Sequence, residues 1–84
     1  MVIGFCMKKT FYKWAVLQNG EIVNYGIEEE PIEIPVERIF PSLFSFADRS
    51  LDELQAYADQ HLKSENYIFR YKEIEIDFSN LEVY

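Results

Sequence analysis

The chain has 84 residues, with 15 acidic against 8 basic ones and a formal net charge of -7. This length predicts a single domain. The hydrophobic content of 49% and the aromatic content of 17% predict a packed core and exclude extended disorder. The acidic balance disfavours direct binding to nucleic acid or to an anionic membrane, because phosphate groups carry the same sign of charge, and it favours encounter with a basic partner.

The cysteine content limits redox and metal chemistry. The single cysteine, Cys6, excludes an intramolecular disulfide and a multi-thiolate zinc site. Residues 2–6 are apolar, but no basic residue precedes them and two lysines soon follow, which is not the pattern of a signal peptide. No run reaches the roughly 18 apolar residues that a membrane span needs. We therefore expect a cytoplasmic protein, in which residues 1–9 form a tail or a short edge strand of the single domain at 1–84.

Residues 10–28 predict a β-hairpin around Asn19 and Gly20. Both residues readily adopt positive φ, which a type I′ turn requires. The turn predicts the register that follows from simple alternation, with the pairs Gln18 and Glu21, Val16 and Val23, Trp14 and Tyr25, and Tyr12 and Ile27. In this register Trp14 and Tyr25 form an inward aromatic pair beneath a helix.

The second face of this hairpin is too apolar for a fully solvated surface. It is predicted to carry Phe11, Lys13, Ala15 and Leu17, opposite Ile22, Asn24, Gly26 and Glu28. We expect another segment or another chain to cover it in part. Gly26 indicates a bulge or a close backbone approach.

The segment after the hairpin begins with a strand pattern and becomes irregular. Ile32, Ile34 and Val36 alternate with polar residues and Pro35, so a strand here would lie at an edge, because proline lacks an N–H group. Residues 39–49 hold too many large apolar side chains for an ordinary exposed loop. We expect this segment to cover the core or to contact a partner.

Ser50 and Glu53 form the pattern of a capping box at the start of a helix. Apolar residues then recur at three- and four-residue spacing, which predicts an amphipathic helix over about residues 50–64. This is a normal helix length.

The C-terminal run 67–78 reads as a strand whose apolar residues change phase. Tyr67, Phe69 and Tyr71 occupy odd positions and Ile74, Ile76 and Phe78 even ones. A β-bulge near Lys72 and Glu73 would return both sets to one face. The elements together predict an α+β two-layer sandwich, an antiparallel sheet of 3–4 strands with one helix on one face.

No motif for catalysis, for a cofactor or for a metal is present. His61 is the single histidine and lacks the further ligands or the positioned partner that a metal site or a general base requires. The three glycines form no phosphate-binding loop. The aromatic and basic run 67–72 would stack on nucleic-acid bases only if its rings faced solvent, and its alternation favours burial. We expect no enzymatic activity and no cofactor.

The sequence favours a small non-catalytic protein-interaction module that inhibits or adapts its partner through an apolar patch with an acidic rim. The patch is predicted to contain Phe40, Leu43, Phe44 and Phe46 together with the second hairpin face. The rim is predicted to contain Glu28, Glu29, Glu30, Glu33 and Glu37. Its partner would be a second copy, giving a homodimer, or a basic host protein. A compact acidic chain of this kind is compatible with a phage or mobile-element origin.

Two other functions stay open. Glu73, Glu75 and Asp77 lie about 6.6 to 6.8 Å apart along one side of an extended strand. With Glu33 and Glu37 they could imitate a phosphate backbone and block a nucleic-acid-binding protein. The third function, a small enzyme or ligand-binding protein, requires a pocket that contains His61 or buried carboxylates.

Overall fold

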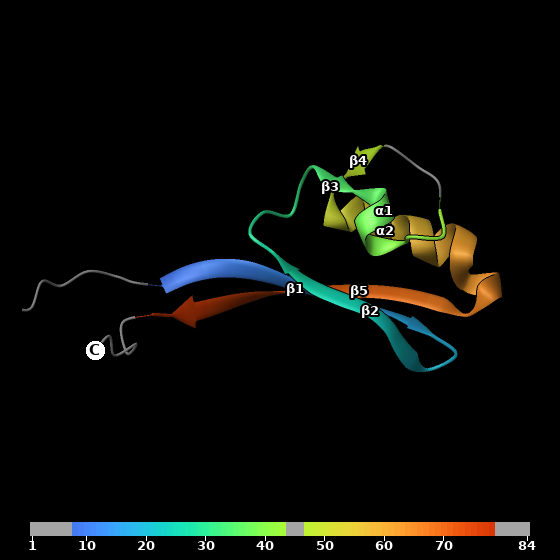
Figure 1. The fold of residues 1–84 in the computed structure, drawn as a ribbon, viewed down its shortest axis with the longest axis horizontal. Helices are drawn as coiled ribbons and strands as arrows, with labels where there is room; N and C mark the ends of the chain where they lie inside the picture. The colour runs from blue at the N-terminus through green and yellow to red at the C-terminus, as the bar shows by residue number, and fades with distance from the viewer. Residues whose placement is uncertain (1–7, 44–46, 79–84) are drawn as a thin grey trace, which may run out of the picture.

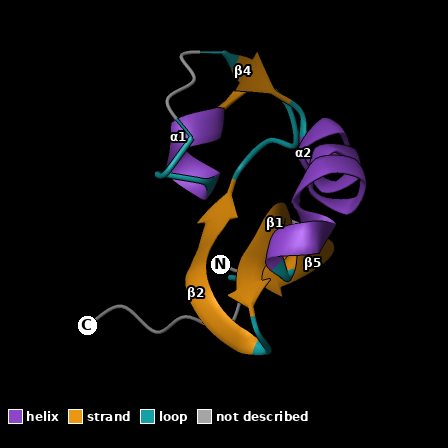
Figure 2. Ribbon diagram, turned by 90° about the vertical axis from the view of Figure 1, so that its right-hand side faces the viewer, coloured by secondary structure: helices purple, strands orange, loops and turns teal. Residues whose placement is uncertain are grey.

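The main element of the fold is a three-stranded antiparallel sheet in the order β2-β1-β5, with the helices on one face (Figure 1). The computed structural model describes residues 8–43 and 47–78. The strands of this sheet are β1 (Lys8–Gln18), β2 (Glu21–Glu28) and β5 (Tyr67–Asp77). Figure 2 shows the two layers end-on, with the helices above the sheet. The predicted α+β class, with a helix packed on an antiparallel sheet, is confirmed.

The hairpin turn forms as predicted. Asn19 and Gly20 have φ angles of 54° and 81°, which are the positive values that a type I′ turn needs. Gln18 pairs with Glu21 directly beside the turn. The dipeptide therefore determines where the chain reverses.

The register beyond the turn differs from the prediction by one residue. Val16 pairs with Asn24 whereas Leu17 pairs with Ile22, so Val23 is an extra residue on β2. This is a β-bulge, and it moves every following side chain of β2 to the other face. The observed pairs past the bulge are Ala15 with Tyr25, Trp14 with Gly26, Lys13 with Ile27, and Tyr12 with Glu28.

The predicted inward pairing of Trp14 with Tyr25 is therefore wrong. Trp14 is buried, but Tyr25 is 77% exposed on the opposite face. The helix side of β2 instead carries Asn24, Gly26 and Glu28. The small and polar side chains of β2 thus face the second layer, and its large apolar ones face away from it.

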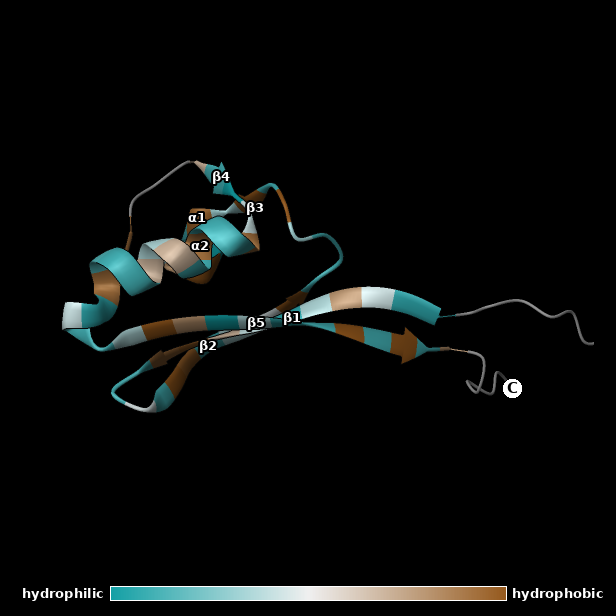
Figure 3. Ribbon diagram, turned by 180° about the vertical axis from the view of Figure 1, so that it is seen from behind, coloured by the Kyte–Doolittle hydropathy of each residue, from teal (hydrophilic) through white to brown (hydrophobic). Residues whose placement is uncertain are grey.

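The bulge predicted in the C-terminal strand is also wrong. The pairing of β1 with β5 is continuous from Lys8 opposite Asp77 to Gln18 opposite Tyr67. The apolar residues of β5 change face for another reason. Strand β2 ends opposite Tyr12, and the helices do not extend past that point, so they cover only the part of β5 before it (Figure 1). Residues 8–11 and 74–77 form a two-stranded arm beyond that point. Hydrophobic positions alternate along β5 out to the end of the arm (Figure 3), where they lie on the face away from the helices.

The expected edge strand at 32–36 is only two residues long and does not join the main sheet. Strand β3 (Ile34–Pro35) pairs with β4 (Asp48–Arg49) in a second small sheet. Glu33 adopts a φ of 55°, which interrupts the extended backbone before β3. After β3 the short helix α1 (Val36–Ile39) begins.

The predicted helix begins at its capping box. Glu53 N donates to Ser50 Oγ at 3.1 Å, and Ser50 N donates to Glu53 Oε1 at 3.2 Å. The helix α2 (Leu51–Tyr57) continues as a π-helical segment η1 (Ala58–Leu62) and a 3₁₀ turn η2 (Lys63–Glu65). The whole helical stretch thus agrees with the expected span of about 50–64.

The hydrophobic core lies between the helices and one face of the sheet. The sheet contributes Trp14, Val16 and Phe69, and Phe69 is fully buried. The remaining core residues come from β3 and α1 with the residue that follows it, and from α2 and η1: Ile34, Val36, Ile39, Phe40, Leu51, Leu54, Ala58 and Leu62. No polar or charged side chain is buried in the described part of the chain. Core packing therefore uses a single face of the sheet.

Candidate protein-interaction surface

The face of the main sheet that points away from the helices has no described element over it (Figures 1 and 2). We call it the open face. The register and the alternation of side chains define its members. They are Lys9, Phe11, Lys13, Ala15 and Leu17 on β1, Ile22, Tyr25 and Ile27 on β2, and Ile68, Arg70, Lys72, Ile74 and Ile76 on β5.

Several large apolar side chains of the open face are exposed. Tyr25 is 77% exposed, Ile22 63%, Ile27 57% and Ile68 45%. A shallow groove of about 800 Å³ passes over this region and is lined in part by Tyr25, Ile27 and Lys72. Exposed apolar residues that are contiguous, rather than scattered, are typical of a binding surface.

The open face results from contacts on the other side of β2. Ideal placement of a Cβ atom on Gly26 brings it to 2.7 Å from Trp14 Cζ2, so only glycine leaves room for the indole ring. Asn24 Nδ2 donates to the carbonyl oxygens of Arg38 and Ile39, at 3.0 Å in both cases. These contacts attach α1 to β2, and they hold the alternate residues of β2 outward.

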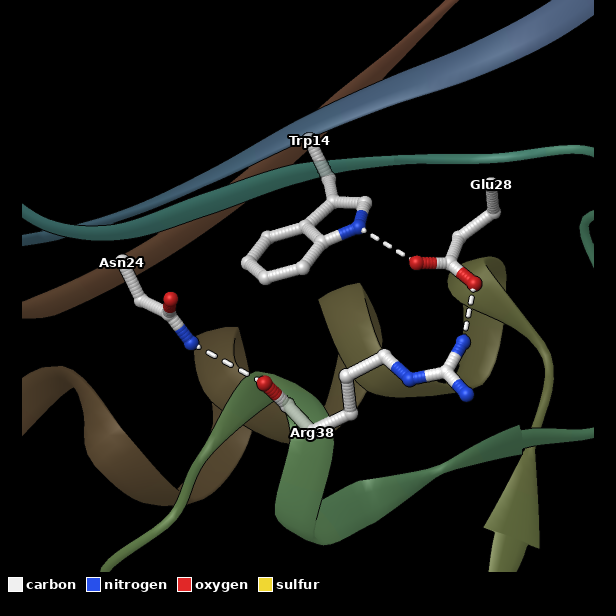
Figure 4. Close-up of polar contacts among 4 residues, drawn as sticks. All are labelled: Trp14, Asn24, Glu28 and Arg38. Carbon is white, nitrogen blue, oxygen red and sulfur yellow. Dashed lines mark hydrogen bonds and ion pairs between the residues drawn. The ribbon is translucent and has the colours of Figure 1, made fainter.

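Glu28 completes this attachment (Figure 4). Trp14 Nε1 donates to Glu28 Oε2 at 3.1 Å, and the Arg38 guanidinium forms an ion pair with the other carboxylate oxygen. The Glu28 side chain is only 11% exposed. Charge-assisted hydrogen bonds to a shielded carboxylate are among the stronger ones in proteins. Glu28 therefore stabilises the fold from within.

The cations of the open face differ in their partners. Arg70 Nη1 lies 3.0 Å from Asp59 Oδ1, and Lys9 Nζ lies 2.8 Å from Glu29 Oε1. Lys13 and Lys72 are exposed and directly opposite each other. Neither makes an ion pair with a described residue.

The predicted apolar patch is only partly on the surface. Phe40 is 3% exposed and its ring packs against Tyr67 and Phe69, so it belongs to the core. Leu43 is half-buried against that core. Phe44 and Phe46 lie outside the described residues. The exposed part of the prediction is the hairpin face, with Tyr25 and Ile27 in place of Asn24, Gly26 and Glu28.

The predicted acidic rim does not form one uniform group. Glu28 faces inward, whereas Glu29, Glu30, Glu33 and Glu37 are exposed. The hydrogen bond and the charge of Lys9 lower the pKa of Glu29 below its ordinary value. Glu30 and Glu33 lie in the connection between β2 and β3, and Glu37 lies on α1.

The acidic row proposed as a nucleic-acid mimic is exposed, with Glu73 at the end of the three-stranded part of the sheet and Glu75 and Asp77 on the arm. Glu73, Glu75 and Asp77 share the face that points toward the helix side. Lys8 Nζ lies 3.7 Å from Glu75 Oε1 within this row. The row therefore contains a compensating cation.

The features expected of an enzyme are limited in the described residues. A concavity of about 750 Å³ is lined by residues that include Arg49, Glu53, Tyr57 and His61. The ring of His61 packs against Tyr57 with centroids 5.0 Å apart. Within residues 8–43 and 47–78, no group of three or more His, Cys, Asp or Glu side chains is arranged to hold a metal ion. His61 thus stacks on Tyr57 and lies in a concavity of the kind that the third predicted function requires.

Comparisons of the chain with protein-family models, curated proteins and solved structures find no match. In the part of the chain that the structure describes, no helix is both long and apolar enough to cross a membrane.

Proposed function

We propose that this protein is a non-catalytic interaction module that binds another protein through the open face and thereby inhibits or adapts it. The observation that carries the proposal is the contiguous exposure of Tyr25, Ile27 and Ile22 on a sheet whose other face is packed. Complete burial of a side chain of this size contributes about 1.5 to 3 kcal/mol. Aromatic anchors at the centre of an interface commonly carry most of the binding energy.

The structure of the hairpin supports this function. The contacts of Trp14, Asn24 and Glu28 fix β2 on its inner side, so Tyr25 and Ile27 are displayed on a rigid strand. A rigid surface loses little conformational entropy on association. A partner would therefore meet a preorganised face.

The test compares Tyr25→Asp/Ile27→Asp with the control Tyr57→Asp. Tyr57 is 43% exposed but lies on α2, away from the open face. The tagged chain is used to capture partners from the cells it comes from, and its solution mass is measured by light scattering. We expect the open-face variant to lose the captured protein, or the dimer if the partner is a second copy, while the control retains it. Equal capture and equal mass for wild type and both variants would contradict the proposal, provided that circular dichroism shows both variants folded.

A second candidate is the nucleic-acid mimic. It is supported by the exposed row Glu73, Glu75 and Asp77 on one face of β5. Replacing all three by their amides removes the charge at nearly constant shape. If mimicry is the function, this variant loses its partner and the open-face variant retains it. The opposite result assigns binding to the open face.

A further inference from the structure

We infer that the open face accepts a protein surface that presents carboxylates among apolar side chains, and that this surface is not a second copy of the chain. The inference rests on the proposed function and specifies the chemistry of the partner. It depends on the position of two lysines, Lys13 and Lys72, at the centre of the apolar face.

The two lysines are neighbours across the strands. Lys13 on β1 and Lys72 on β5 are direct partners in the antiparallel register. Side chains at such positions lie about 4.5 to 5.5 Å apart at Cβ. Ile27 flanks Lys13 on the other side, and both lysines line the apolar groove with Tyr25. The two lysine side chains therefore leave the sheet at adjacent positions within an apolar surface.

This arrangement is unfavourable in the isolated chain. Like charges directly opposite each other destabilise a strand pair. The other cations of the open face each have an anion, Glu29 for Lys9 and Asp59 for Arg70, but Lys13 and Lys72 have none among the described residues. Local conflicts of this kind are expected where a protein meets a ligand that resolves them. Carboxylates on a partner would neutralise both ammonium groups.

A second copy that docks face to face does not supply those carboxylates, and one that docked through another, acidic surface would form a ring or an open filament rather than a two-fold dimer. None of the strand positions of the open face carries Asp or Glu, so two open faces in contact would bury four lysines against one another or against apolar side chains. Buried charges without counter-charges are strongly destabilising. Glu29 and Asp59 at the border of the face are already paired. The open face is therefore suited to a different protein.

A protein partner fits the face better than a nucleic acid. The groove is lined by three aliphatic side chains, three aromatic ones and three cations, and two of these cations, Lys13 and Lys72, pair with no described acid. A net charge of -7 repels a phosphate backbone, which carries one charge per nucleotide, more strongly at longer range than it repels a segment with a few carboxylates. A protein segment with apolar side chains and a few acidic residues fills the groove and pairs with both lysines.

The experiment selects ligands without assuming a partner. A displayed library of random linear peptides is panned against the wild-type chain and the selected peptides are sequenced. We expect enrichment of Asp and Glu beside aliphatic and aromatic residues. The peptides should bind Lys13→Glu/Lys72→Glu at least about tenfold more weakly, the factor expected for loss of a close charge pair. This variant keeps a like-charge pair at the same positions, so its fold should be as stable as that of wild type.

The control is Arg49→Glu/Lys63→Glu, which makes the same change in net charge at exposed positions outside the open face. It should bind the selected peptides within about twofold of wild type, because exposed charges at a distance are screened by salt.

A library that yields no acidic peptides, or peptides that bind the lysine variant as well as wild type, overturns the inference. If such peptides are still lost in Tyr25→Asp/Ile27→Asp, the proposed function stands and only the acidic chemistry of the partner is refuted. A wild-type dimer that Tyr25→Asp dissociates, or lysine-dependent binding of poly(dT), also overturns it.

Discussion

The two faces of the main sheet use the same kinds of residue for different purposes. On the helix side, Trp14, Val16 and Phe69 are at most 5% exposed and make the core. On the open face, Tyr25 and Ile27 are more than half exposed. Hydrophobicity alone therefore does not determine burial in this sheet. The single extra residue Val23 decides which set of β2 side chains meets the helices.

The largest expected effect separates the two faces by stability. Phe69→Ala removes a fully buried ring that packs near Trp14 and Phe40, and it should lower the free energy of unfolding by about 3 to 5 kcal/mol. Tyr25→Ala should change it by no more than about 0.5 kcal/mol, because the side chain is largely solvated. Urea unfolding followed by Trp14 fluorescence measures both. Equal losses for the two variants would refute the assignment of faces.

The next effect concerns the close approach at Gly26. Gly26→Ala places a Cβ atom against the Trp14 indole, and it should cost about 1 to 3 kcal/mol as overpacking while changing the Trp14 emission. The control, Gly20→Ala, has nothing within 4 Å and a φ of 81°, so its cost of about 1 to 2 kcal/mol comes from the backbone alone. Its Trp14 emission should not change. An unchanged emission in Gly26→Ala would contradict the contact.

A smaller effect tests the conflict on the open face. Lys72→Glu places an acid opposite Lys13, and it should raise the free energy of unfolding by about 0.2 to 1 kcal/mol. The gain should shrink at high salt. Arg49→Glu serves as the control and should show no such gain. A loss of stability in Lys72→Glu would mean that the two lysines do not oppose each other.

The smallest effect depends on pH. Tyr71 donates its hydroxyl proton to Asp52, and this hydrogen bond, with a smaller contribution from burial, raises the pKa of Tyr71 above its ordinary value of about 10. Because the folded pKa is the higher one, the contribution of Tyr71 to stability is complete below the unfolded pKa and is lost as pH rises through the folded pKa. Asp52→Asn should bring the pKa back toward 10. Absorbance titrations of wild type and of Asp52→Asn are each compared with those of the same protein carrying Tyr71→Phe, and the difference isolates the titration of Tyr71. An identical pKa of Tyr71 in wild type and in Asp52→Asn would exclude the hydrogen bond.

The features that depend on local chemistry could be predicted from the sequence. Asn19 and Gly20 produce the turn because of their backbone preferences, and Ser50 and Glu53 cap α2 through contacts three residues apart. The α+β class follows from such elements. None of these features needs knowledge of distant contacts.

The register could not be predicted, because the contacts that set it are distant in sequence. Alternation in β2 places Tyr25 and Ile27 with Trp14, whereas the structure chooses Asn24, Gly26 and Glu28. That choice depends on the room that Gly26 leaves for the indole and on hydrogen bonds to α1, which follows β2 in the chain. The apolar phase change in β5 likewise predicts a bulge from the sequence alone, whereas in the structure it coincides with the end of β2.

The sequence predicts the type of candidate site, an apolar surface, but not all of the residues that form it. The sequence predicts an apolar hairpin face that another segment or chain covers in part. The apolar face exists and carries Ile22 as predicted, but past the bulge it holds Tyr25 and Ile27, and no described element covers it. The irregular apolar segment around Phe40 predicts that this residue belongs to the patch, but it packs into the core instead. The opposition of Lys13 and Lys72 depends on the pairing of β1 with β5, which no local pattern reveals.

The most direct test of the account is the pattern of cross-strand nuclear Overhauser effects in the hairpin, measured on the wild-type chain. We predict contacts between the backbones of Trp14 and Gly26 and of Ala15 and Tyr25, with the Tyr25 ring remote from α2. Backbone contacts between Trp14 and Tyr25 and between Val16 and Val23 would show that β2 has no bulge. They would place Tyr25 in the core and refute the open face as the binding surface.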